Sequence, residues 1–140
     1  MSVETTLRIE IAVPPGQVAH VGSIPLAITF RNGGTPVRIL RQFEPLPVFF
    51  SFDMVDADGT PLLLPGGGKI DLRRNVMEYV TLARGETYML AVDIHHLMPS
   101  PLKADAYTLS VTYHNQYGED CFRGSLHSNT ITVTIGGNQR

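Results

Sequence analysis

The stretch Tyr107-Thr108-Leu109-Ser110-Val111-Thr112-Tyr113 determines how the rest of this sequence is interpreted. Apolar or aromatic residues alternate in it with small hydroxyl residues. Successive side chains of a β-strand point to opposite faces of a sheet, so Leu109 and Val111 share one face with the two tyrosines. Such alternation is typical of a strand that packs on a core with one face only. The stretch therefore predicts a half-buried β-strand.

The same period of two recurs along most of the chain and is interrupted by turn residues. No window has apolar residues at helical spacing over several turns, and only residues 95–103 are expected to hold one helical turn. Seven to nine short strands predict an all-β chain, namely an immunoglobulin-like antiparallel β-sandwich. The other expected strands cover residues 7–13, 26–30, 37–40, 50–54, 70–72, 79–82, 88–94 and 131–135.

The length of 140 residues is that of a single domain, expected over residues 1–136 with a short tail at 137–140. A domain of this size buries roughly two-thirds of its unfolded surface, which is enough for a hydrophobic core. The residues expected to face that core are Leu26, Ile28, Phe30, Phe52, Leu90, Val92, Leu109, Val111, Ile131 and Val133.

Charge, cysteine content and hydropathy narrow the classes of partner and compartment. Eleven basic and thirteen acidic residues give a net charge of −2, so no electrostatic feature predicts nucleic acid or a membrane as partner. Cys121 is the only cysteine, which rules out an intrachain disulfide and suits a reducing compartment. The sequence has neither an export signal nor an apolar run of about 20 residues. The chain as written is expected to be cytoplasmic, although an exported protein without its signal would look the same.

The order of these features resembles bacterial immunoglobulin-like and fibronectin-type domains. The resemblance rests on residues 27–32, 82–86, 107–113 and 128–133 and spans most of the chain. The sandwich is also loosely similar to the bacterial intracellular proteinase inhibitor domain (BsuPI-like) and to the non-catalytic sandwich of some secreted metalloproteases. The His-Glu-x-x-His helix of those enzymes is absent, so that second resemblance implies only an accessory role. No inhibitory residue of the family can be assigned to a position of this chain.

Tyr107 has the spacing of a tyrosine corner, since it stands two residues before the inward position Leu109. In that motif the phenol forms a hydrogen bond with backbone a few residues upstream. The alternative is a core tyrosine whose hydroxyl contacts water. Either role is structural.

Metal sites and covalent catalysis both lack the residues that they need. His95 and His96 are adjacent, so on an extended segment they point to opposite sides and seldom share an ion. Cys121 has no second cysteine at the spacing of a structural zinc site. Cys121 with His114 or His127 is the only nucleophile–base pairing on offer, and two acidic residues before the thiol disfavour its reactive thiolate. We expect no enzyme, no metal and no cofactor.

Asp56 and Asp58 beside Gly59 distantly resemble a calcium-binding loop. The ligand pattern does not continue, because Leu62-Leu63-Leu64 occupies positions where oxygen ligands are needed. A β-turn favours the same residues, since Asp accepts backbone N–H bonds and Gly tolerates positive φ. The sequence therefore predicts a tight turn here.

Two apolar runs break the alternation and suggest a protein contact. Within residues 48–50 and 62–64, at least Phe49 and Leu63 should face away from the core unless residues 65–70 fold over them. Clustered apolar residues at a surface mark protein–protein contacts. Phe49, Leu62 and Leu63 are therefore the candidate contact residues of a non-enzymatic binding or assembly module, whose partner is another protein or a second copy.

The alternative function is that of a proteinase inhibitor acting through an extended loop. Residues 41–47 and 99–104 both contain prolines, which would limit the entropy lost on binding. Carbohydrate binding is a third and weaker option, because the chain has no Trp to form an aromatic platform.

Overall fold

The computed structural model describes residues 6–20, 22–41, 46–62, 78–97 and 103–136. This part of the chain is almost entirely β, with one helical turn and one 3-10 turn. None of its helices is both long and apolar enough to cross a membrane. In chain order the elements are β1 (Leu7–Ala12), β2 (Pro25–Asn32), β3 (Val37–Leu40), α1 (Leu46–Phe49), β4 (Phe50–Val55), β5 (Tyr79–Leu82), β6 (Thr87–Asp93), η1 (His95–Leu97), β7 (Asp105–Asn115), β8 (Gly124–His127) and β9 (Ile131–Ile135).

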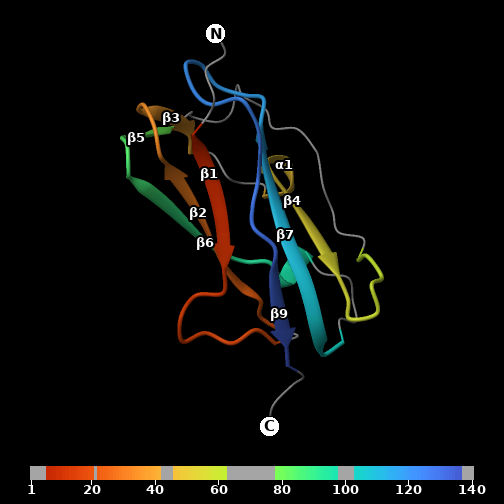
Figure 1. Cartoon of the computed structure of the whole chain (residues 1–140). Helices are drawn as coiled ribbons and strands as arrows, with labels where there is room; N and C mark the ends of the chain where they lie inside the picture. The colour runs from red at the N-terminus through yellow and green to blue at the C-terminus, as the bar shows by residue number, and fades with distance from the viewer. Residues whose placement is uncertain (1–5, 21, 42–45, 63–77, 98–102, 137–140) are drawn as a thin grey trace.

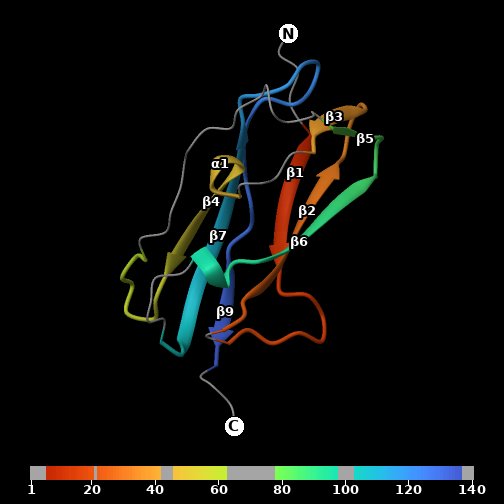
Figure 2. The same ribbon diagram turned by 180° about the vertical axis from the view of Figure 1, so that it is seen from behind.

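The strands form three antiparallel sheets (Figures 1 and 2). One has the order β1-β2-β6, and a short ribbon pairs β3 with β5. The largest sheet has β7 at its centre and β4 on one side of it. β8 and β9 share the other side, because β8 pairs with residues 112–115 of β7 and β9 with residues 105–109. The prediction of an all-β antiparallel sandwich of seven to nine strands is confirmed.

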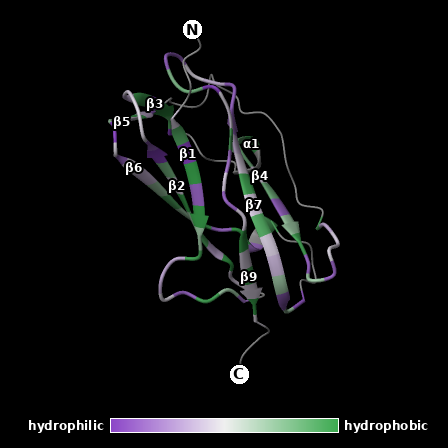
Figure 3. Cartoon of the chain, in the orientation of Figure 1, coloured by the Kyte–Doolittle hydropathy of each residue, from purple (hydrophilic) through white to green (hydrophobic). Residues whose placement is uncertain are grey.

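Aromatic side chains join the two larger sheets across the core. The Phe30 ring of β2 lies 5.0 Å from the Tyr113 ring of β7 and 6.5 Å from the Phe50 ring of β4, in edge-to-face contacts. Bands of hydrophobic and hydrophilic residues alternate along β1 and β4 (Figure 3), as expected for strands with one buried face. Seven of the ten predicted core residues are buried, whereas Leu90, Val92 and Ile131 are half-buried and pack against the core.

The structure decides between the two alternatives for Tyr107 and confirms the turn predicted at Asp56. The Tyr107 hydroxyl donates a hydrogen bond of 2.7 Å to the backbone carbonyl of Lys103, as in a tyrosine corner. Asp56 Oδ1 accepts the backbone N–H groups of Asp58 and Thr60, each at 2.9 Å, and Gly59 has a φ of +85°. Residues 56–60 are therefore a tight turn, in which the Asp56 carboxylate is occupied by backbone donors.

The predicted exposure of Phe49 is wrong, because its side chain is fully buried. Leu46 to Phe49 form a helical turn, which tolerates the proline at residue 47 in its first turn. The turn ends the period of two before β4 begins, so Val48, Phe49 and Phe50 all face the core one after another. The Phe49 ring lies 6.0 Å from the ring of Tyr117.

Candidate functional site

The three predicted contact residues do not form one exposed patch in the described structure. Phe49 belongs to the core, and Leu62 is half-buried against it. Leu63 and the covering segment 65–70 lie outside the described residues, as do residues 70–72 of the expected edge strand. The proposed inhibitory loops are largely outside them too, since only Arg41, Leu46, Pro47, Lys103 and Ala104 are described, and Leu46 and Pro47 begin α1.

Two of the titratable residues singled out from the sequence, Cys121 and His127, have a local structural partner. Cys121 Sγ donates to the Tyr117 carbonyl at 3.4 Å, and the His127 ring lies 2.9 Å from the Thr112 hydroxyl. Within the described ranges, no three His, Cys, Asp or Glu side chains are grouped so that they could hold a metal ion. The strand edges are therefore the candidate binding surfaces, because they offer backbone groups to a partner.

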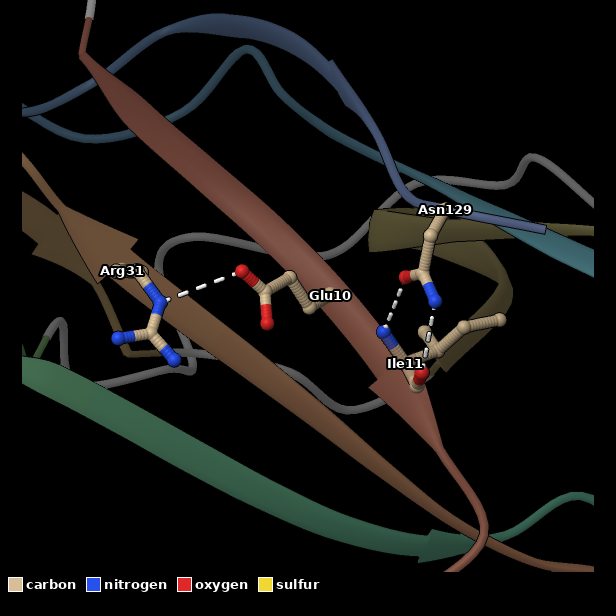
Figure 4. A network of polar contacts seen from close by, with 4 residues as sticks. All are labelled: Glu10, Ile11, Arg31 and Asn129. Atoms are coloured by element: carbon tan, nitrogen blue, oxygen red, sulfur yellow. Dashed lines mark hydrogen bonds and ion pairs between the residues drawn. The ribbon is translucent and has the colours of Figure 1, made fainter. Parts of the chain in front are cut away.

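The edge of β1 is closed by a side chain from the loop between β8 and β9. Asn129, between β8 and β9, accepts the Ile11 N–H at 2.7 Å and donates to the Ile11 carbonyl at 3.1 Å (Figure 4). One amide thus satisfies both backbone groups of Ile11, as a neighbouring strand would. On the outer face nearby, Glu10 pairs with Arg31 of β2 at 3.3 Å.

Two further edges are covered by the chain itself. At β4, the N–H of Leu62 donates to the Met54 carbonyl at 2.8 Å, so the returning chain lies along the end of this strand. Just after β9, the N–H of Gly136 donates to the Ala19 carbonyl at 3.1 Å. Leu62 therefore helps to cover an edge, which is a structural role that the sequence did not suggest.

β6 differs from these strands because β2 is its only partner among the described strands. The strand register pairs Leu90 with Ile28 and Tyr88 with Phe30. Hydrogen bonds from Ile94 to Ile24 and from Asn32 to Glu86 continue this ladder at its two ends. Because bonded and non-bonded pairs alternate in an antiparallel ladder, Tyr88, Leu90 and Val92 direct their backbone groups toward β2.

The remaining residues of β6 direct their backbone N–H and C=O groups away from β2. We call this row, formed by Thr87, Met89, Ala91 and Asp93, the β6 edge. Figures 1 and 2 show β6 at the border of its sheet, on the side away from β1. The β6 edge is a row of backbone donors and acceptors that a further strand can pair with.

The side chains of β6 suit contact with another polypeptide. Met89 is 60% exposed, which is rare for a large apolar residue in this fold. On the inner face, Tyr88, Leu90 and Val92 are only half-buried, whereas the inner residues of β4 are fully buried. Asp93 is the only charged residue, and the strand has no proline. Apart from Asp93 at its end, β6 thus lacks the charges and prolines that protect edge strands from pairing.

Both ends of β6 are fixed by side chains. At its start, Glu86 Oε1 accepts the Ala83 N–H at 2.7 Å across a turn in which Gly85 has a φ of +84°. At its end, the Asp93 carboxylate accepts hydrogen bonds from Ser23 Oγ at 2.7 Å, from the Ile24 N–H at 2.9 Å and from the His95 N–H at 3.0 Å.

The environment of Asp93 also changes its acidity. Partial burial alone would raise the pKa of this carboxyl, but the hydrogen bonds from Ser23, Ile24 and His95 and the nearby imidazole of His95 outweigh it. The pKa is therefore lowered from its ordinary value of 3.8. The ionised carboxylate holds the end of β6 against the beginning of β2, so the β6 edge is presented in a fixed, extended form.

No model of a known protein family matches this sequence. A search of curated proteins finds no match either.

Proposed function

We propose that this chain is a non-enzymatic protein-binding module of the immunoglobulin-like type, which binds an extended segment of its partner at the β6 edge. The observation that carries the proposal is the row of outward-facing backbone groups on Thr87, Met89, Ala91 and Asp93, beside an exposed Met89. In strand addition, main-chain hydrogen bonds supply affinity and alternate side chains supply specificity.

The contrast with the other edges supports this assignment. At β1, the backbone N–H of Ile11 is bonded to Asn129. At β4 the Met54 carbonyl is bonded to Leu62, and just after β9 the Gly136 N–H is bonded to Ala19. Among the described strands, β6 has a partner on one side only, and Asp93 is the single charged residue of its seven. A strand edge of this kind is suited to pairing.

Two substitutions close the β6 edge without touching its ladder to β2. Met89→Lys places a charge on the outer face, and Ala91→Pro removes an outward-facing N–H. Ala12→Lys is the matched control, because Ala12 is exposed on the same face of the same sheet but lies on β1.

The test is affinity capture from the source cells with the wild-type chain and the three variants, followed by binding measurements with the purified partner. We expect the partner to bind wild type and Ala12→Lys with equal affinity. Met89→Lys and Ala91→Pro should not bind it. A partner that binds all four proteins with equal affinity would contradict the proposal.

A further inference from the structure

Building on the proposed function, we infer that the partner at the β6 edge is a second copy of this chain, bound by antiparallel pairing of β6 with β6 about a two-fold axis. A symmetric dimer of this kind places the same surface on both subunits, so β6 must be complementary to itself. Both the backbone register and the side chains of β6 meet that requirement.

The backbone pattern restricts the possible registers. Outward-facing groups must lie opposite outward-facing groups, so Thr87, Met89, Ala91 and Asp93 of one copy must meet the same set in the other. A slip of one residue would place them opposite groups already bonded to β2. The register centred on Leu90 meets the condition, and it alone uses the whole strand from Thr87 to Asp93.

The side chains are complementary in the register centred on Leu90. On the outer face, the exposed Met89 lies beside the small Ala91 of the second copy, and Asp93 lies beside the uncharged Thr87. On the inner face, Leu90 meets Leu90 and Tyr88 meets Val92, so side chains that are half-buried in one copy become covered.

The charges at β6 do not oppose this pairing. The two Asp93 carboxylates lie at opposite ends of the paired strands, about 20 Å apart for strands that rise 3.3 Å per residue. A foreign strand would need its own complementary sequence, whereas β6 already contains one. The result is a continuous sheet with the order β1-β2-β6-β6-β2-β1 across the two subunits.

The first measurement is molar mass by light scattering over a wide range of protein concentration. We expect the mass to double as concentration rises, and Met89→Lys to raise the dimer dissociation constant by about tenfold or more. Ala12→Lys should dimerise like wild type. Because Ala91→Pro could perturb folding, hydrogen exchange is measured as well, and dimerisation should protect the amides of Thr87, Met89, Ala91 and Asp93.

Single cysteines then determine the register. In a Cys121→Ser background, Leu90→Cys should form an intermolecular disulfide on mild oxidation, because opposed non-bonded residues bring their Cα atoms within disulfide range. Met89→Cys and Ala91→Cys should cross-link much more slowly. In this register residue 89 lies opposite residue 91 of the second copy, so the two cysteines of either variant are not opposed. Faster cross-linking by either of them would overturn the register.

A monomer at every concentration would overturn the inference, as would a dimer that Met89→Lys leaves intact. Failure of the proposed function is distinguishable from this result. If the chain is a monomer at every concentration but still binds a foreign partner that Met89→Lys fails to bind, the proposed function stands. Only the inference that the partner is a second copy would then be wrong.

Discussion

The two edge strands of the sheet β1-β2-β6 differ in how their outer backbone groups are bonded. At β1, the Asn129 side chain forms two hydrogen bonds with the backbone of Ile11, whereas β6 has β2 as its only described partner strand. The outer faces differ as well, since β1 carries Arg8 and Glu10 while β6 carries Met89 and Ala91.

This difference shows that the amphipathic pattern of a strand does not decide whether its edge is available. Both strands alternate, and both place one face toward the core. Closure of β1 depends on an asparagine 118 residues away in the sequence. Edge pairing is therefore decided by tertiary structure, and the difference between the two edges can be tested by substitution.

The largest expected effect is a difference in the free energy of unfolding between serine variants at the buried Phe49 and at the exposed Met89. Phe49→Ser should lower the free energy of unfolding by about 3–5 kcal/mol, because it removes a fully buried ring. Met89→Ser should change it by less than about 0.5 kcal/mol, because its side chain is largely in solvent. Urea unfolding of both variants measures the difference. A Phe49→Ser protein as stable as wild type would mean that Phe49 lies on the surface, as the sequence suggested.

The sequence predicted those parts of the fold that depend on local pattern. Alternation located most strands, and the Asp56 turn follows from residue type and spacing. For Tyr107 the spacing left two alternatives, of which the structure shows the tyrosine corner. β8 was missed because Gly124 to His127 contain one apolar residue and no alternation. The candidate contact at Phe49 failed because the helical turn Leu46–Phe49, which contains Pro47, changes which face each residue presents.

The β6 edge could not be predicted because the sequence does not give strand order. The lack of charge and proline between Thr87 and Val92 was visible, but the same composition suits a central strand. Only the sheet order places this uncharged stretch at a border. Asn129 was missed for the same reason, since it looks like an ordinary turn residue until β1 is placed beside it.

The next effect tests closure of the β1 edge. Asn129→Ala should lower the free energy of unfolding by about 1–3 kcal/mol, because it leaves the N–H and C=O of Ile11 without their protein partners. Thr130→Ala, at the exposed neighbouring residue, is the control and should have little effect. Chemical denaturation provides the measurement.

Removing Asn129 should also give the sheet a second edge that can pair. Asn129→Ala should therefore associate more strongly than wild type, and adding Met89→Lys should not restore the wild-type mass, because the new contact lies at β1. If Met89→Lys suppressed all of the extra association, the β1 edge would not be the one that Asn129 protects.

The smallest effect concerns the end of β6 and is confined to acid. The folded-state pKa of Asp93 lies below the ordinary 3.8, so its ionised form adds stability above that pH. This contribution is lost as the pH falls through the folded-state pKa. Asp93→Asn should remove it, so the stability difference between wild type and variant should shrink as the pH drops below about 4.

Denaturant unfolding of wild type and Asp93→Asn across the acid range measures this difference, with Asp53→Asn on the exposed face of β4 as a control for general charge effects. A difference that stays constant down to the lowest pH would mean that the Asp93 carboxylate does not hold β6 through its charge. Hydrogen exchange sharpens the result. If the bonds from Ser23, Ile24 and His95 fix the strand end, acid should loosen the amide of Val92 in β6 and that of Ile94 just after it before it affects β1.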